Sequence, residues 1–177
     1  GFFLDPDDLA AVVERVAEAR PDAVLLCGDL VNQFGDECEL LARGLEKLRA
    51  PLGLFAVPGN HDYYADRRLR LWRRAVESVG ARVLLNQGVR VEYGGAAFWL
   101  AGVDDLREGV PDLRAALAGR IPGEPAVLLS HHPDFFPEAA RAGVDLTLSG
   151  HTHGGQVLLG GRTPLRHTRY GFWSGRF

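Results

Sequence analysis

The chain has 177 residues and a net charge of −3, and 46% of its residues are hydrophobic. This length suits one domain with a substantial core, and the slightly acidic charge gives no reason to expect specific nucleic-acid binding. Two cysteines, Cys27 and Cys38, are too few to suggest a disulfide framework. No apolar run approaches the roughly 18–20 residues that a membrane span needs. We therefore expect a protein of the cytoplasm or of the membrane periphery, with no targeting segment visible.

Helices and short apolar strands alternate in the first half of the chain. Residues 5–20 carry apolar side chains at helical spacing, with Asp5 as the expected cap. Residues 23–27 form a short apolar run of the kind found in buried parallel strands. The same alternation predicts a helix over 36–49, a strand over 52–57 and an arginine-rich helix over 64–79.

In the second half of the chain, three expected strands follow one another, and helices and strands then alternate again. Three expected strands are joined by glycine-containing turns, which favours antiparallel pairing. They cover residues 83–85, 89–93 and 96–103. Helices follow over 112–118 and 137–141, and strands over 126–129 and 146–148. This order predicts one α/β domain over residues 1–177 with a mixed sheet system.

Polar side chains with metal-binding chemistry follow the ends of the expected strands. They are Asp29, Asn60, His61, His131, His151 and His153. The apolar runs VLLC, LFAV, VLLS and LTLS come shortly before them, and five of the six histidines lie in these segments. Each piece alone is more often a turn or a core residue than a ligand. Together, at the ends of several strands, they predict a metal site.

The ligand types narrow the choice of metal. Carboxylate, amide and imidazole ligands suit Mn, Fe, Zn or Co rather than a thiolate site or a purely oxygen-liganded calcium site. One carboxylate shared by two ions is what a two-metal centre requires, with the ions about 3.5–4 Å apart. Cys27 ends a strand beside these residues, but we interpret it as a buried small hydrophobe rather than a soft ligand.

The segments GDLVN, GNHDYY, SHHPD and GHTHGGQ, in this order, resemble the calcineurin-like metallophosphoesterase family, and most closely its bacterial branch with the last motif. The resemblance runs from Gly1 to about Gln156. It implies a four-layer αββα sandwich of mixed sheets with two metals at the strand ends. On that pattern the bridging carboxylate belongs to Asp29. Asn60, His131 and His151 would join it at one metal, and His153 would serve the other.

The resemblance also implies a catalytic pair. His61 would contact the phosphate and protonate the leaving oxygen, and Asp62 would orient its ring. The family's first motif, Asp-x-His, is missing here, and no histidine precedes His61. Because the chain starts at Gly1 and has no Met, we expect that motif and its central strand to lie upstream. A truncated C-terminal end is a further expectation. We therefore predict at most one tightly bound divalent ion and marginal stability for this segment.

The function that the resemblance implies is metal-dependent hydrolysis of phosphodiester or pyrophosphate bonds by a metal-activated hydroxide. The substrate would be a phosphoester, either a small molecule or lipid-linked. A non-catalytic metal-binding scaffold that recruits a protein partner is the alternative, and a zinc amidase is weaker because Asn is an unusual zinc ligand. The oligomeric state is left open.

Two further groups of residues each have a functional and a structural interpretation. The aromatic pairs at 135–136 and 172–173 could line an acyl or base pocket, although core packing is favoured. Arg67, Arg68 and Arg70 could meet an anionic substrate, although a solvated helix face is the simpler interpretation.

Overall fold

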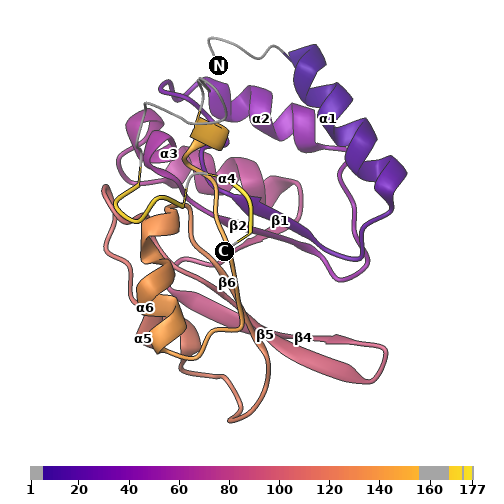
Figure 1. Cartoon of the computed structure of the whole chain (residues 1–177). Coiled ribbons are helices and arrows are strands. Elements are labelled where there is room, and N and C mark those ends of the chain that lie inside the picture. Colours follow the sequence, from indigo (N-terminus) through magenta and orange to yellow (C-terminus); the bar gives the residue numbers. More distant parts are fainter. Residues whose placement is uncertain (1–5, 156–167, 173, 177) are drawn as a thin grey trace.

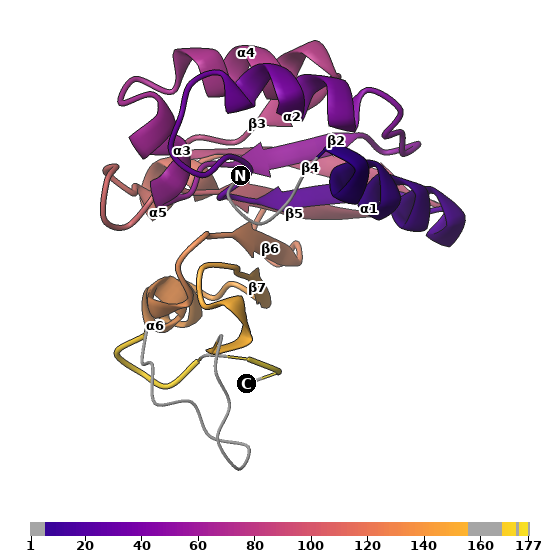
Figure 2. The same cartoon turned by 90° about the horizontal axis from the view of Figure 1, so that it is seen from above.

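Two β-sheets lie face to face at the centre of the molecule, and helices cover their outer faces (Figures 1 and 2). The computed structural model describes residues 6–155, 168–172 and 174–176. Asp5, Gln156 and Trp173 therefore lie outside the described residues. The first sheet is parallel and has the order β1 (Val24–Cys27), β2 (Leu54–Val57), β3 (Ala81–Val83).

The second sheet is mixed and has the order β4-β5-β6-β7. Strands β4 (Gln87–Tyr93) and β5 (Ala96–Gly102) form an antiparallel hairpin. Strands β6 (Ala126–Leu129) and β7 (Leu146–Leu148) continue the sheet in parallel. The pairing types follow from the connections. A two-residue glycine turn joins β4 to β5, whereas helical segments separate β5, β6 and β7.

The helices divide between the two outer faces. Helices α1 (Pro6–Ala19), α2 (Glu37–Leu45) and α4 (Arg70–Ser78) pack with the first sheet around one apolar cluster that includes fully buried Trp72. Helix α5 (Leu113–Leu117) packs on the second sheet. Helix α6 (Phe136–Arg141) does the same.

A third apolar cluster fills the space between the sheets, with Phe55 and Val57 of the first sheet against Leu100 and Leu129 of the second. The helix, sheet, sheet, helix order confirms the four-layer αββα sandwich that the sequence predicts. Among the described residues, no helix combines the length and apolar character needed to cross a membrane.

One expected helix proves to be two. The segment expected as a helix over 64–79 contains the end of α3 (Asn60–Ala65) and all of α4, with a break between them. Asp66 is extended and Leu69 is left-handed, with φ of 54°, so the helical hydrogen bonds cannot continue through this segment. The helix expected over 36–49 ends at Leu45. Leu40 of α2 and Leu71 of α4 are exposed.

Candidate metal centre

Four strands deliver the predicted ligands to one edge of the sandwich. Asp29 follows β1, Asn60 follows β2, His131 follows β6 and His151 follows β7. His131 Nε2 lies 3.1 Å from Asp29 Oδ2, and the rings of His131 and His151 have their centres 5.2 Å apart. Parallel strands end at the same edge of their own sheet, which groups Asp29 with Asn60 and His131 with His151. The face-to-face packing of the two sheets brings both groups together, so residues about 120 positions apart in sequence meet there.

The glycines of the motifs allow this close approach. A Cβ placed on Gly28 would lie 2.6 Å from His131 Nδ1, and one on Gly59 would lie 2.3 Å from Asp29 Oδ1. A Cβ on Gly150 would lie 3.5 Å from His131 Nδ1. The buried ring of His131 is therefore enclosed by three backbone segments. Each of these motif glycines stands where a larger side chain would meet a proposed ligand.

Three proposed ligands have an unusual backbone conformation. The φ angles of Asp29, His151 and His153 are 53°, 63° and 49°, in the left-handed region that non-glycine residues rarely occupy. Such conformations cost roughly 1–3 kcal/mol each and concentrate at ligand-binding and catalytic sites. Their occurrence at three of the five proposed ligands agrees with a functional arrangement of these loops.

The hydrogen bond to Nδ1 of His131 sets which of its nitrogens is available to a metal. Nδ1 donates to the carbonyl oxygen of Cys27 at 2.7 Å, so a neutral ring presents the lone pair of Nε2 toward Asp29. Burial opposes the charged form of His131, but the adjacent carboxylate outweighs it and raises the pKa of the ring. Burial acts to raise the pKa of Asp29, and His131 with His61 nevertheless holds it below the ordinary value. His131 Nε2 and Asp29 Oδ2, 3.1 Å apart, are therefore two neighbouring atoms suited to hold a cation.

Asn60 and His151 complete the donor set. The Asn60 amide nitrogen lies 3.3 Å from the Tyr64 hydroxyl, which leaves Oδ1 buried without a hydrogen-bond partner among the described residues. Burial, together with the neighbouring His132 and His131, lowers the pKa of His151 to about 3. Its ring is therefore neutral at pH 7, as a metal ligand must be. A buried amide oxygen, a carboxylate and two imidazoles fit a divalent transition metal.

His61 lies beside this donor set on the first turn of α3. Its backbone N–H donates to Asp29 Oδ1 at 2.9 Å, and its ring Nδ1 donates to the carbonyl oxygen of Asn32 at 2.7 Å. Because a carbonyl only accepts, this contact leaves the ring's other nitrogen, Nε2, for a ligand. The ring is half-buried, so a bound substrate can reach it.

The structural role of Asp62 differs from the expected one. It does not orient the His61 ring, whose Nδ1 is held by Asn32 instead. The fully buried Asp62 carboxylate accepts four backbone N–H groups, from Asp29, Leu30, Val31 and Gly59, at 2.8–3.2 Å. It therefore joins the loop after β1 to the start of α3 and shapes the loop that carries Asp29.

His132 and Asp105 are site residues that the sequence reasoning missed. Both are buried, and His132 Nε2 lies 3.2 Å from Asp105 Oδ2. The His132 ring is centred 3.7 Å from that of His151, and His131, His132 and His151 can bring ligand atoms within 4.8 Å of one another. Asp105 also accepts the backbone N–H groups of Arg107 and Glu108 through its other oxygen. The tandem histidines and the acidic pair after β5 were the available sequence signals.

The last proposed ligand, His153, begins the short 3-10 turn η2 (His153–Gly155) and is exposed. It lines a cavity of about 450 Å³ together with Asp29, His131 and His151. His153 thus lines the same cavity as Asp29, His131 and His151 but stands outside the cluster of His131, His132 and His151. Cys27 is half-buried, and burial raises the pKa of its thiol to about 11, which favours the structural interpretation over a thiolate ligand.

Comparison with known proteins agrees with this centre. The profile of the calcineurin-like phosphoesterase family matches residues 5–155. An uncharacterized metallophosphoesterase of Aquifex aeolicus is 37% identical over 169 residues, covering 90% of this chain and 62% of the relative. The uncharacterized metallophosphoesterase YkuE of Bacillus subtilis is 30% identical over 168 residues, covering 93% and 58%. The chain belongs to the calcineurin-like phosphoesterase family.

Relatives also occur within larger membrane proteins. The transmembrane protein with metallophosphoesterase domain of Bos taurus is 34% identical over 161 residues, covering 82% of this chain but 36% of the relative. The chain thus spans between about a third and three fifths of the length of these three relatives.

Proposed function

We propose that this chain is the metal-dependent phosphoesterase domain of a hydrolase that cleaves phosphodiester or pyrophosphate bonds. Family membership supports a metal-dependent phosphoesterase, and the convergence of Asp29, His131 and His151 from three strands carries the proposal. The substrate class and the number of ions go beyond the family relationship. They rest on the chemistry of the residues around the cavity.

The ligand roles follow from the donor atoms. Asp29, Asn60, His131 and His151 would hold one divalent ion, and His153 would approach a second ion that shares Asp29. A bound divalent ion supplies Lewis acidity toward the phosphoryl oxygens and lowers the pKa of water. The protein places the Asp29 carboxylate among the other ligands and keeps the His151 ring neutral. A hydrogen bond to the Cys27 carbonyl orients the His131 ring. At most one tightly bound ion in this chain remains our prediction.

His61 supplies the proton step in this proposal. With Nδ1 donating to the Asn32 carbonyl, a protonated ring can donate its second proton from Nε2 to the leaving oxygen. Asp62 contributes at a distance, through the backbone of the loop that carries Asp29. It is therefore a positioning residue in this chain.

The test is hydrolysis of bis(4-nitrophenyl) phosphate with Mn²⁺, alongside metal content by elemental analysis. We expect Asp29→Asn to lower both metal content and turnover, and His61→Ala to lower turnover while metal content is kept. Asp112→Asn is the matched control, because Asp112 caps α5 and Asn caps a helix equally well.

The outcomes separate the proposal from its alternative. Bound metal with no turnover of this or a pyrophosphate substrate would argue for the scaffold that recruits a protein. Turnover that is unchanged in Asp29→Asn would place the chemistry elsewhere and overturn the proposal.

A further inference from the structure

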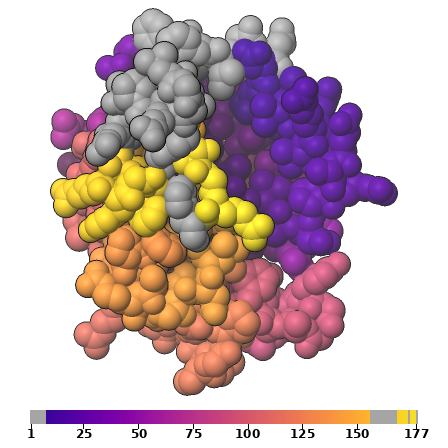
Figure 3. All heavy atoms as spheres, in the orientation of Figure 1, coloured from indigo at the N-terminus to yellow at the C-terminus, as the bar shows by residue number. Residues whose placement is uncertain are grey.

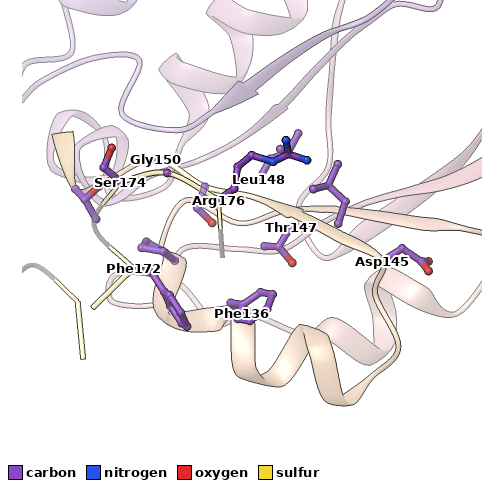
Figure 4. A pocket seen from close by; sticks show the side chains of 13 residues that line it. Phe136, Asp145, Thr147, Leu148, Gly150, Phe172, Ser174 and Arg176 are labelled. Atoms are coloured by element: carbon purple, nitrogen blue, oxygen red, sulfur yellow. The ribbon is translucent and has the colours of Figure 1, made fainter. Parts of the chain in front are cut away.

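A second cavity lies next to the metal-site cavity. It has a volume of about 350 Å³ and lies between β7, the start of α6 and the C-terminal segment (Figure 4). The two cavities share five lining residues: Ser149, Gly150, Thr152, Ser174 and Gly175. In Figure 3 the C-terminal segment, drawn yellow, lies against the orange residues that form this side of the molecule. A ligand held at the metals can therefore extend into the second cavity.

Aromatic rings form one wall of this second cavity. Phe136 and Phe172 meet edge to face, with ring centres 5.3 Å apart and planes at 80°. Figure 4 shows both rings below β7. The neighbouring Phe135 is buried in the core of the second sheet, so the two adjacent phenylalanines have separate tasks. The core interpretation of the sequence is confirmed for Phe135, whereas Phe136 lines a cavity beside the site.

Polar and charged side chains line the rest of the cavity. Thr147 directs its hydroxyl into the space near Phe136, and Ser174 lies beside Gly150, on the side shared with the metal-site cavity (Figure 4). Asp145 and Arg176 also line the cavity, so hydrogen-bonding groups of both charges are present. An alkyl chain would fill the apolar part of the cavity but would give the hydroxyls nothing to bind. An aromatic ring with polar atoms at its edge fits both the apolar and the polar side of the cavity. Its faces pack on Phe136, and its edge accepts or donates hydrogen bonds.

We infer that this cavity binds the organic group of the phosphoester, and that this group is an aromatic ring with hydrogen-bonding atoms at its edge, as in a nucleobase. The inference rests on the proposed function, since the phosphate is taken to sit at the metals. It deepens that function by naming the chemistry of the substrate next to the phosphorus. Strand β7 links the two subsites, with Leu148 near the metal loop and Thr147 beside the rings.

The test is a binding measurement with phosphonates, which are not hydrolysed. Dissociation constants of phenylphosphonate, hexylphosphonate and methylphosphonate are measured by calorimetry on the Mn²⁺-loaded chain. Saturation-transfer NMR with benzamide, an aryl amide without phosphate, examines the second cavity alone. We expect phenylphosphonate to bind at least about tenfold more tightly than methylphosphonate, and hexylphosphonate to bind more weakly than the phenyl compound.

Two variants and one control locate the effect. Phe136→Ala and Phe172→Ala should each remove most of the phenyl preference and the benzamide signal. They lie on different segments, a helix and an irregular tail, so a folding defect in one does not affect the other. Tyr93→Ala is the matched aromatic control, because Tyr93 is exposed at the end of the β4–β5 hairpin.

Each outcome decides between the two proposals. Equal affinity for phenyl and methyl compounds overturns the aromatic subsite and leaves the proposed function standing. Tighter binding of hexylphosphonate also overturns it, in favour of an acyl group. Loss of all phosphonate binding, with a benzamide signal that depends on Phe136, keeps the subsite and counts against the phosphoesterase centre. Absence of every signal overturns both.

Discussion

The carboxylate of Asp62 offers the sharpest test of how the fold holds its site. Each of its oxygens accepts two backbone N–H groups: Oδ2 from Asp29 and Gly59, and Oδ1 from Leu30 and Val31. Asp62→Asn keeps the shape but turns one oxygen into an NH₂ group. Whichever way the amide lies, two backbone N–H groups, one buried and one partly buried, then face a donor instead of an acceptor.

The expected cost follows from those two lost bonds. Hydrogen bonds to charged groups contribute about 1.5–3 kcal/mol each, which gives about 3–6 kcal/mol for the pair. A neutral amide avoids the desolvation cost of the buried charge and its repulsion from Asp29, which offsets part of this, so we expect a loss of about 2–3 kcal/mol in the free energy of unfolding. Against a typical stability of about 5–15 kcal/mol, that is a large fraction.

Urea unfolding of the metal-free chain, followed by tryptophan fluorescence, measures this loss. Burial raises the pKa of Asp62 to about 7, although hydrogen bonds from the backbone N–H groups of Gly59 and Val31 act to lower it. Measuring at pH 8 therefore keeps the carboxylate ionised. Asp112→Asn is the control. The exposed Asp112 caps α5 by accepting one backbone N–H, and Asn caps a helix nearly as well, within about 0.5 kcal/mol. A loss below about 1 kcal/mol in Asp62→Asn, at an unchanged m-value, would refute the reasoning.

Three further outcomes follow from the site. His132→Ala and Asp105→Asn should each weaken Mn²⁺ binding by about 10–100-fold in calorimetry, because the pair packs against a ligand ring; unchanged affinity would make the pair purely structural. Gly59→Ala should abolish tight Mn²⁺ binding, since its Cβ would lie 2.3 Å from a ligand oxygen, and normal binding would contradict the packing described. Burial raises the pKa of Cys27 and Cys38 from 9.0 to about 11. The rate of their alkylation at pH 8 should therefore be about 100-fold lower than that of a free thiol, and should rise tenfold per pH unit. Fast labelling of both cysteines would refute this.

Local sequence was enough to locate the strands and most proposed ligands. The runs before Asp29, His131 and His151 are short, apolar and followed by glycine or a polar residue, so both the strand and its end are visible. Parallel strands share their direction, so the ends of β1 and β2 lie at one edge of the first sheet and those of β6 and β7 at one edge of the second. The α/β class and the position of these ligands at strand ends are therefore readable from the sequence. The four-layer sandwich was implied by the family resemblance, and the packing of the two sheets brings the ligands together.

Contacts between distant segments are different, because no local pattern specifies them. Asp62 follows His61 in sequence, which suggested a pair, yet its carboxylate faces the loop after β1, about thirty residues earlier. His132 and Asp105 meet only because β5 and β6 are neighbours in the second sheet. Which side chain an oxygen or nitrogen binds depends on strand order and loop conformation, and both depend on how the buried faces of the two sheets pack together. The sequence states the kind of chemistry present, and the tertiary packing assigns each group its partner.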